Sequence, residues 1–81
     1  MDNYQHTVDR LKDRFGSINK VAQAAGRKQN TVSGWRKRPG GVPLDDAVTI
    51  AQNAMVMGVD VSYEEIVAWI GEDARQRRVA A

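Results

Sequence analysis

The chain has 81 residues, a formal net charge of +2, one histidine and no cysteine. A chain of this length forms one small domain, and the lack of cysteine excludes a disulfide framework and a cysteine-ligated metal site. We expect the single histidine, His6, on the polar face of the first helix, with no metal or cofactor. No apolar run approaches the roughly 18 residues of a membrane span. Residues 1–4 lack the features of an export signal, so a cytoplasmic protein is expected.

The small net charge hides two blocks of opposite sign. Every charged side chain from Arg14 to Arg38 is positive, and every one from Asp45 to Asp73 is negative. A basic block is typical of a surface that faces phosphates, because neutralised phosphates release counterions. The acidic block should then face away from DNA. The alternative is that charged residues, 27% of the chain, only solvate a small domain.

Glycines divide the chain into segments whose apolar residues recur at helical spacing. The first helix is expected to end at Gly16, and its apolar stripe consists of Tyr4, Val8, Leu11 and Phe15. Ser17 is a good N-cap for a second helix that Gly26 ends. The residues of that helix expected to face the core are Ile18, Val21, Ala22 and Ala25. A third helix is predicted over residues 29–36, with Val32 and Trp35 on its inner face.

A loop is predicted at residues 38–41, where the sequence reads Arg-Pro-Gly-Gly. A fourth helix should follow, with Pro43 in its first turn, acidic residues at its positive end and Gly58 after its last turn. Its expected buried face consists of Leu44, Ala47, Val48, Ala51, Ala54 and Met55. The run Met55, Val56 and Met57 widens this face, which indicates either a buried last turn or a partner surface.

Residues 62–65, Ser-Tyr-Glu-Glu, match a capping box that opens a fifth helix, and we expect Gly71 to end it. The expected inward residues of this helix are Tyr63, Ile66, Val67 and Ile70. Trp69 lies at the edge of that face and is either core or a homodimer contact. No segment alternates convincingly with period two. The sequence therefore predicts an all-α, compact five-helix domain over residues 1–71 and a flexible polar tail over residues 72–81.

The spacing inside the basic block predicts a helix-turn-helix between the second and third helices. Ala22 is small where the two helices cross, next to Val21, and Gly26 permits the left-handed conformation of the turn. Val32 and Trp35 follow six and nine residues later and hold the second helix of the motif against the first.

These residues resemble the helix-turn-helix family of small phage repressors, of the lambda Cro and repressor type. The resemblance covers residues 18–37 well and residues 4–70 less specifically, and residues 20–37 are also similar to the phage CII activators. It implies a lambda repressor-like fold and a sequence-specific transcriptional regulator that binds double-stranded DNA, as a homodimer at least when on DNA.

The resemblance places Gln29 and Asn30 at the first base-reading positions, with Lys28, Thr31 and Ser33 beside them. A side-chain amide offers the donor and the acceptor that adenine requires in the major groove. The alternatives are a helix cap for Asn30 and a solvated surface position for Gln29. Phosphate contacts are expected from residues around the motif, namely Ser17, Asn19, Lys20, Arg27, Arg36, Lys37 and Arg38.

Two residues depart from the pattern of this family. Arg27 stands where relatives usually carry an aliphatic residue, and we expect its stem to cover the core while its head reaches solvent or phosphate. Gly34 lies inside the recognition helix, where glycine costs about 1 kcal/mol relative to alanine. It indicates either a close approach of the backbone to DNA or a tolerated exposed defect.

The leading functional prediction is a phage or prophage repressor that binds a palindromic operator, with half-sites about 34–36 Å apart. An alternative is an activator or a DNA-binding antitoxin, whose acidic half would contact RNA polymerase or a toxin. A third is a helical adaptor whose basic block binds an acidic protein without dependence on Gln29 and Asn30. No histidine–carboxylate pair, cysteine nucleophile, phosphate-binding loop or metal-ligand cluster is recognisable, so an enzyme is not expected.

Overall fold

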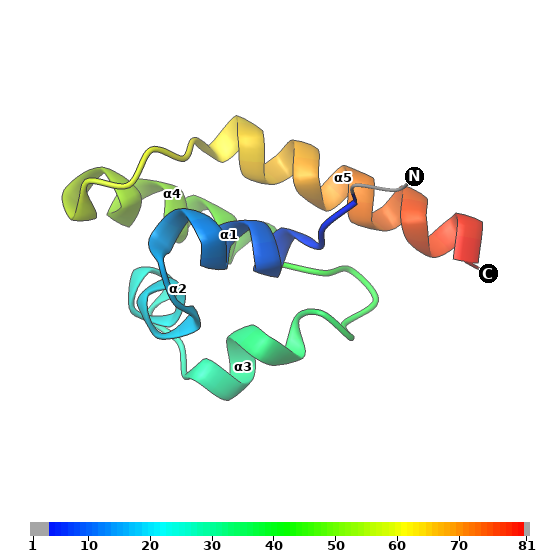
Figure 1. Ribbon diagram of the computed structural model, residues 1–81, viewed down its shortest axis with the longest axis horizontal. Helices are drawn as coiled ribbons and strands as arrows, with labels where there is room; N and C mark the ends of the chain where they lie inside the picture. Colours follow the sequence, from blue (N-terminus) through cyan, green and yellow to red (C-terminus); the bar gives the residue numbers. More distant parts are fainter. Residues whose placement is uncertain (1–3, 81) are drawn as a thin grey trace.

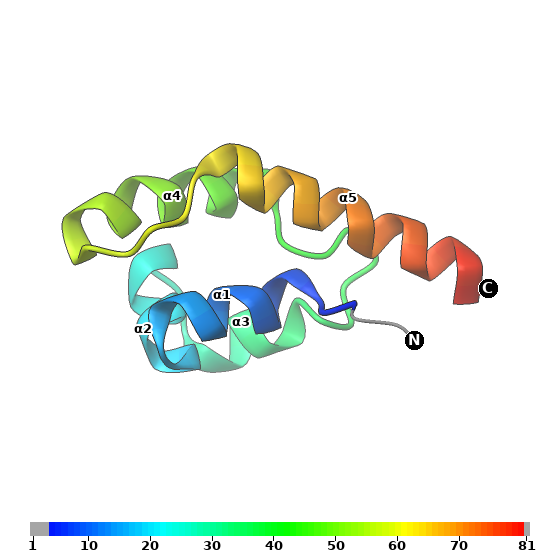
Figure 2. The same cartoon turned by 45° about the horizontal axis from the view of Figure 1, so that its top comes forward.

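The computed structural model describes residues 4–80, and this part of the chain forms five helices and no strand. The helices are α1 (Thr7–Phe15), α2 (Ile18–Ala25), α3 (Gln29–Gly34), α4 (Leu44–Met57) and α5 (Tyr63–Ala80). In Figure 2, α4 and α5 lie together above α1, α2 and α3. The predicted all-α, five-helix domain is confirmed. Residues 1–3 and 81, at the ends of the predicted domain and tail, lie outside the described residues.

Two helix starts form as the sequence predicts. The hydroxyl oxygen of Ser17 accepts a hydrogen bond from the Lys20 N–H at 3.2 Å and caps α2. At α5, the Glu65 N–H donates to the Ser62 hydroxyl at 3.2 Å, and the Ser62 N–H donates to the Glu65 carboxylate at 3.1 Å. This reciprocal pair is a complete capping box, which satisfies two N–H groups that the helix itself cannot.

The core lies where α2 packs against α1, α3 and α4, and where α5 packs on α4 and α1. Its fully buried large side chains come from every helix and from the loop after α3, and they include Leu11, Val21, Val32, Val42, Ile50 and Ile66. One apolar stripe from each helix thus meets in a single cluster. This arrangement leaves the opposite faces of α3, α4 and α5 for other contacts.

The predicted buried face of α4 is partly wrong. Leu44, Val48 and Met55 are exposed, and the buried side is built instead around Ile50 with Ala47 and Ala54. The helix carries apolar residues on more than one side, and its alanine-rich side allows the closest approach of α2. Pro43 is the N-cap of α4 and not a residue of its first turn.

The end of α4 and the start of α5 also expose more apolar surface than predicted. Met55 and Val56 are 82% and 85% exposed, so the alternative of a buried last turn for α4 is wrong. On α5, Ile66 is buried as expected, but Tyr63 and Val67 are exposed.

The predicted end of α5 at Gly71 is wrong, because the helix continues to Ala80. Asp73, assigned to the tail by the sequence, is 9% exposed and accepts hydrogen bonds from the start of α1. The Thr7 hydroxyl donates to it at 2.6 Å and the Thr7 N–H at 3.2 Å, and the Tyr4 hydroxyl donates as well. Burial and the hydrogen bond to Asp73 raise the pKa of the Tyr4 phenol. These long-range hydrogen bonds stabilise the part of α5 that follows Gly71.

The prediction that His6 lies on the polar face of the first helix is wrong, because His6 lies directly before α1. It is the N-cap of α1, and its Nδ1 accepts the Val8 N–H at 3.1 Å. Its Nε2 lies 3.4 Å from an oxygen of Asp73. His6 therefore belongs to the same junction between α1 and α5, and Tyr4 precedes the helix in which it was expected.

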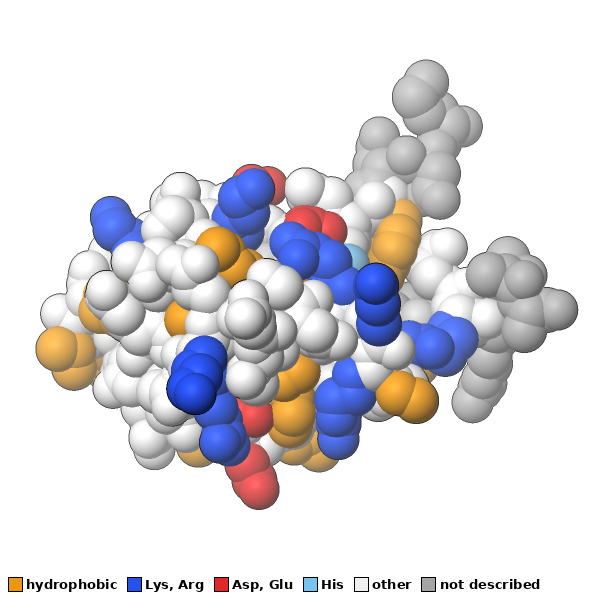
Figure 3. All heavy atoms as spheres, turned by 90° about the horizontal axis from the view of Figure 1, so that it is seen from below, with side chains coloured by type: hydrophobic (Ala, Val, Ile, Leu, Met, Phe, Trp, Pro, Cys, Tyr) orange, Lys and Arg blue, Asp and Glu red, His pale blue; other side chains and the backbone are white. Residues whose placement is uncertain are grey.

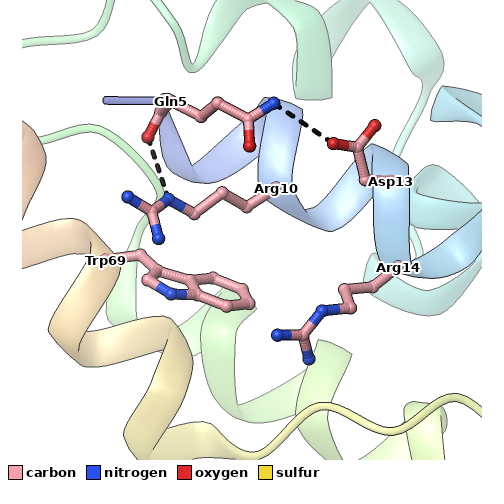
Figure 4. Close-up of a pocket in the computed structure, with 5 residues that line it drawn as sticks. All are labelled: Gln5, Arg10, Asp13, Arg14 and Trp69. Carbon is pink, nitrogen blue, oxygen red and sulfur yellow. Dashed lines mark hydrogen bonds between the residues drawn. The ribbon is translucent and has the colours of Figure 1, made fainter. Parts of the chain in front are cut away.

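Trp69 is part of the core, with 7% of its surface exposed. Figure 4 shows its ring between the side chains of Arg10 and Arg14, whose guanidinium carbons lie 5.6 and 5.2 Å from the ring centroid. Both arginines also form ion pairs with α5, Arg10 with Glu72 at 2.9 Å and Arg14 with Glu65 at 3.3 Å. Trp69 thus joins α5 to α1 and offers little surface to a partner chain.

We expect Asp73→Ala to lower the free energy of unfolding by about 2–4 kcal/mol, because the buried donors of Thr7 lose their acceptor. Glu72→Ala, which removes a half-exposed ion pair in the same turn, should cost less than about 1 kcal/mol. Urea denaturation followed by circular dichroism measures both. Equal losses in the two variants would contradict the role of Asp73 as the clamp between α5 and α1.

Candidate nucleic-acid interface

The turn between α2 and α3 is fixed by its backbone. Gly26 has φ +68°, in the left-handed region that favours glycine, and its N–H donates to the Gln23 carbonyl at 3.2 Å. The Arg27 N–H donates to the Ala22 carbonyl at 3.0 Å. The two bonds form the usual closing motif of a helix C-terminus. They set the direction in which the chain leaves α2 and enters α3.

α3 is short, and two side chains hold it in place. It begins at Gln29 and ends at Gly34, so the predicted helix over residues 29–36 is two residues too long. From Gly34 onward the backbone forms bonds between residues three apart, as in a 3₁₀-helix. The Trp35 N–H donates to the Val32 carbonyl at 3.1 Å, and the Lys37 N–H donates to the Gly34 carbonyl at 3.1 Å. Val32 is fully buried and Trp35 is 4% exposed, so this side of the segment packs on the core.

The opposite side of α3 is polar and open to solvent. Lys28, Gln29, Asn30 and Thr31 are all exposed, and Ser33 is half-buried. Lys28 is the N-cap of α3 and makes no side-chain cap bond, so the cap alternative for Asn30 is wrong. In Figure 1, α3 lies at the lower edge of the molecule, on the other side of α1 from α5. The structure thus brings the predicted base-reading residues together on one exposed surface, hereafter the α3 face.

The predicted phosphate-binding arginines are engaged within the protein. Arg27 Nε lies 2.8 Å from a carboxylate oxygen of Asp46, which is buried at the start of α4. Arg36 donates to Asp9 on α1 through Nη2 at 2.7 Å and Nε at 3.1 Å. The carboxylates of Asp46 and Asp9 thus neutralise the two arginines that the sequence analysis assigns to phosphate contacts. The pair of Arg36 with Asp9 could not be predicted from the sequence, since the two residues are 27 positions apart.

Arg38 also folds back on its own loop. Its Nη1 donates to the Gly41 carbonyl at 3.0 Å, and its own carbonyl accepts from Arg77 at 2.9 Å. These bonds connect the loop after α3 to the last turns of α5. A structural role therefore accounts for the position of Arg38 without a ligand.

Three lysines around the α3 face remain unpaired. Lys20, Lys28 and Lys37 are exposed, and none of them forms an ion pair with another described residue. Viewed from the side of α3, Lys and Arg side chains are spread over the surface and Asp and Glu side chains are few (Figure 3). Asn19 is exposed beside Lys20. The Lys20 N–H is already bonded to Ser17, so the predicted phosphate site at the start of α2 has one donor fewer than expected.

Comparisons with models of protein families, with curated proteins and with solved structures find no match for this chain. Among the described residues, no group of three or more His, Asp or Glu side chains could hold a metal ion. Over the same part of the chain, no helix combines the length and apolar character needed to cross a membrane. The assignment of a function consequently depends on the geometry of the α3 face.

Ala22→Leu should lower the free energy of unfolding by about 1–3 kcal/mol, because Ala22 is buried in the packed cluster that includes Val21 and Val32. The neighbouring Gln23 is exposed, and Gln23→Leu should change stability by less than about 0.5 kcal/mol. Thermal unfolding followed by circular dichroism compares the two leucines on the same helix. A normal melting curve for Ala22→Leu would contradict the close packing at this position.

Proposed function

We propose that α2 and α3 act as a helix-turn-helix and that the protein is a sequence-specific, DNA-binding transcriptional regulator. The observation that carries the proposal is the division of α3 into two sides. One side is buried through Val32 and Trp35, and the other presents Gln29 and Asn30, whose side chains form no hydrogen bond with another described residue. Free side-chain amides at the start of a helix that packs on the core suit the donor and acceptor pattern of adenine in the major groove.

The lysines around the α3 face supply the non-specific part of binding. Lys20, Lys28 and Lys37 lack carboxylate partners among the described residues, so their charges are available to phosphates. Arg27 and Arg36 contribute less to the affinity for DNA than the sequence predicts. Each would have to give up its ion pair with Asp46 or Asp9 before it could bind a phosphate. We therefore expect a salt dependence that reflects the lysines more than the arginines.

The resemblance to small phage repressors favours repression, although residues 20–37 are also similar to the phage CII activators. We propose a repressor that binds a palindromic operator as a homodimer and excludes RNA polymerase from an overlapping promoter. An activator or an antitoxin would use the same α3 face and differ in the position of its site relative to the promoter. The adaptor alternative uses the basic surface without any preference among DNA sequences.

Selection from a randomised pool of duplexes tests this proposal, with the recovered duplexes bound again at two salt concentrations. We expect an inverted repeat whose half-sites are about 34–36 Å apart, and an affinity that falls steeply with salt. Sequence-blind binding, or no binding at low salt, would contradict the proposed function.

Gln29→Ala and Asn30→Ala should each weaken binding to the selected duplex by about 1–3 kcal/mol and relax the preference at particular base pairs. Gln52→Ala on α4 is the matched control, because Gln52 is also exposed, carries a side-chain amide and lies on a different helix. Fluorescence anisotropy with the selected duplex and its single-base variants measures affinity and preference. Unchanged preference in both α3 variants would remove these side chains from base reading.

Gly34→Ala should raise the free energy of unfolding by about 0.5–1 kcal/mol, because alanine is the better helix former. Gly34 does not have a positive φ, and an added Cβ would have no neighbour within 4 Å. A loss of stability would contradict this open environment. The affinity of the same variant for the selected duplex distinguishes the two interpretations of Gly34. A loss indicates close approach of the backbone to DNA, and no change indicates a tolerated defect.

A further inference from the structure

A hollow of about 330 Å³ lies between α4 and the first turn of α5. Its walls are mostly apolar and include Met55, Val61 and Tyr63. In Figure 1, the connection between α4 and α5 lies at the other end of the molecule from the last turn of α5 and away from α3. The site, hereafter the α4–α5 hollow, therefore shares no lining residue with the α3 face.

The chain around the α4–α5 hollow is held by contacts within the protein. The Val59 N–H donates to the Ala54 carbonyl at 2.9 Å, and the Asp60 carbonyl accepts from Arg14 at 2.7 Å. Val61 is buried in the core cluster, and the capping box fixes the first turn of α5. The hollow is thus formed before any ligand arrives, which limits the conformational entropy that binding would cost.

Two apolar side chains at the α4–α5 hollow remain uncovered by the described part of the chain. Met55 is 82% exposed and Tyr63 is 36% exposed, although both line the hollow. A methionine side chain is flexible and adapts to the surface of a partner. Tyrosine combines an apolar ring with a polar hydroxyl and is enriched at protein interfaces. Together they suit a bulky apolar side chain that another molecule supplies.

The charged side chains near the α4–α5 hollow are carboxylates. No lysine or arginine occurs between Arg38 and Arg75. Glu64 lines the hollow and Asp60 lies in the connection before it. Both are exposed, and neither forms an ion pair with another described residue. Three other carboxylates of the acidic half are paired with arginines, and they belong to Asp46, Glu65 and Glu72.

This uncompensated negative charge determines the kind of partner that fits. Carboxylates beside an apolar hollow attract a cationic ligand and repel the phosphates of nucleic acids and anionic lipids. An uncharged apolar ligand would fill the hollow but leave Asp60 and Glu64 without a partner. A ligand that is both apolar and cationic matches both features.

We propose that the α4–α5 hollow binds a short basic segment of another protein. A bulky apolar side chain of that segment enters the hollow beside Met55 and Tyr63, and neighbouring lysine or arginine side chains pair with Asp60 and Glu64. An apolar anchor surrounded by polar contacts is the usual arrangement of a protein interface. The inference does not rest on the proposed function, because binding at the hollow requires neither DNA nor the α3 face.

Selection of peptides of about 12 residues from a randomised displayed library, on the immobilised full chain, supplies the probe. We expect the recovered peptides to combine a large apolar residue with neighbouring lysines or arginines. Synthetic copies should bind with a Kd of about 100 µM or tighter. In spectra of the ¹⁵N-labelled protein, the largest shift changes should belong to residues 55–64. Binding should weaken with added salt, because the carboxylates are exposed.

Met55→Gln should weaken binding of the selected peptide by about tenfold, because it removes the apolar contact at nearly constant size. Val56→Gln is its matched control, since Val56 is 85% exposed but lies about 100° further round the helix. Glu64→Gln and Asp60→Asn should each weaken binding by about two- to fivefold. Asp45→Asn is their control, because Asp45 is also an exposed carboxylate without an ion pair to a described residue, at the other end of α4. Neither control should change the affinity.

Fluorescence anisotropy with the labelled peptide measures these affinities, and circular dichroism checks that the variants are folded. All five substituted side chains are exposed, so the variants should fold. A selection that enriches no peptide, or only acidic or uncharged ones, would overturn the proposal. Shift changes on α3, or equal losses in Met55→Gln and Val56→Gln, would do the same. Self-association of the wild-type chain that Met55→Gln abolishes would assign the hollow to a second copy instead.

Discussion

The burial of Val32 and Trp35 is the constraint on which the remainder of the proposed site depends. A helix of six residues is unstable by itself, and these two side chains attach it to the core. Because they occupy one side of the segment, they also determine that Gln29 and Asn30 project to solvent. The left-handed Gly26 sets the angle of entry into α3. The same packing that stabilises α3 thus selects the residues available to a ligand.

The charges of the molecule have two distinct roles. Arg27 and Arg36 neutralise carboxylates of α4 and α1 and hold the turn and α3 to the surrounding helices. Lys20, Lys28 and Lys37 carry no such partner in the described part of the chain, and the proposed function assigns their charge to DNA phosphates. A long-range clamp at Asp73 and the ring of Trp69 connect α5 to α1 in a comparable way. Polar contacts between helices therefore compensate for a core that is thin in so small a protein.

Local chemistry made the starts of α2 and α5 and the turn after α2 predictable. Ser17, Gly26 and the pair of Ser62 with Glu65 act through neighbours within a few residues, so their roles are readable in the sequence. The continuation of α5 past Gly71 was not predictable, because the bonds that stabilise it come from residues far away along the chain. The arginine pairs escaped prediction for the same reason. On α4, apolar residues on several sides of one helix gave no indication of which side meets the core.

The most direct test of DNA recognition by α3 is a titration of the ¹⁵N-labelled protein with a selected duplex, followed by the backbone amide signals in NMR spectra. The account predicts that the largest shift changes belong to residues 28–33 and to the start of α2, while the amides of α4 and α5 change less. Changes concentrated on α4 and α5, or an absence of changes over residues 28–33, would contradict it.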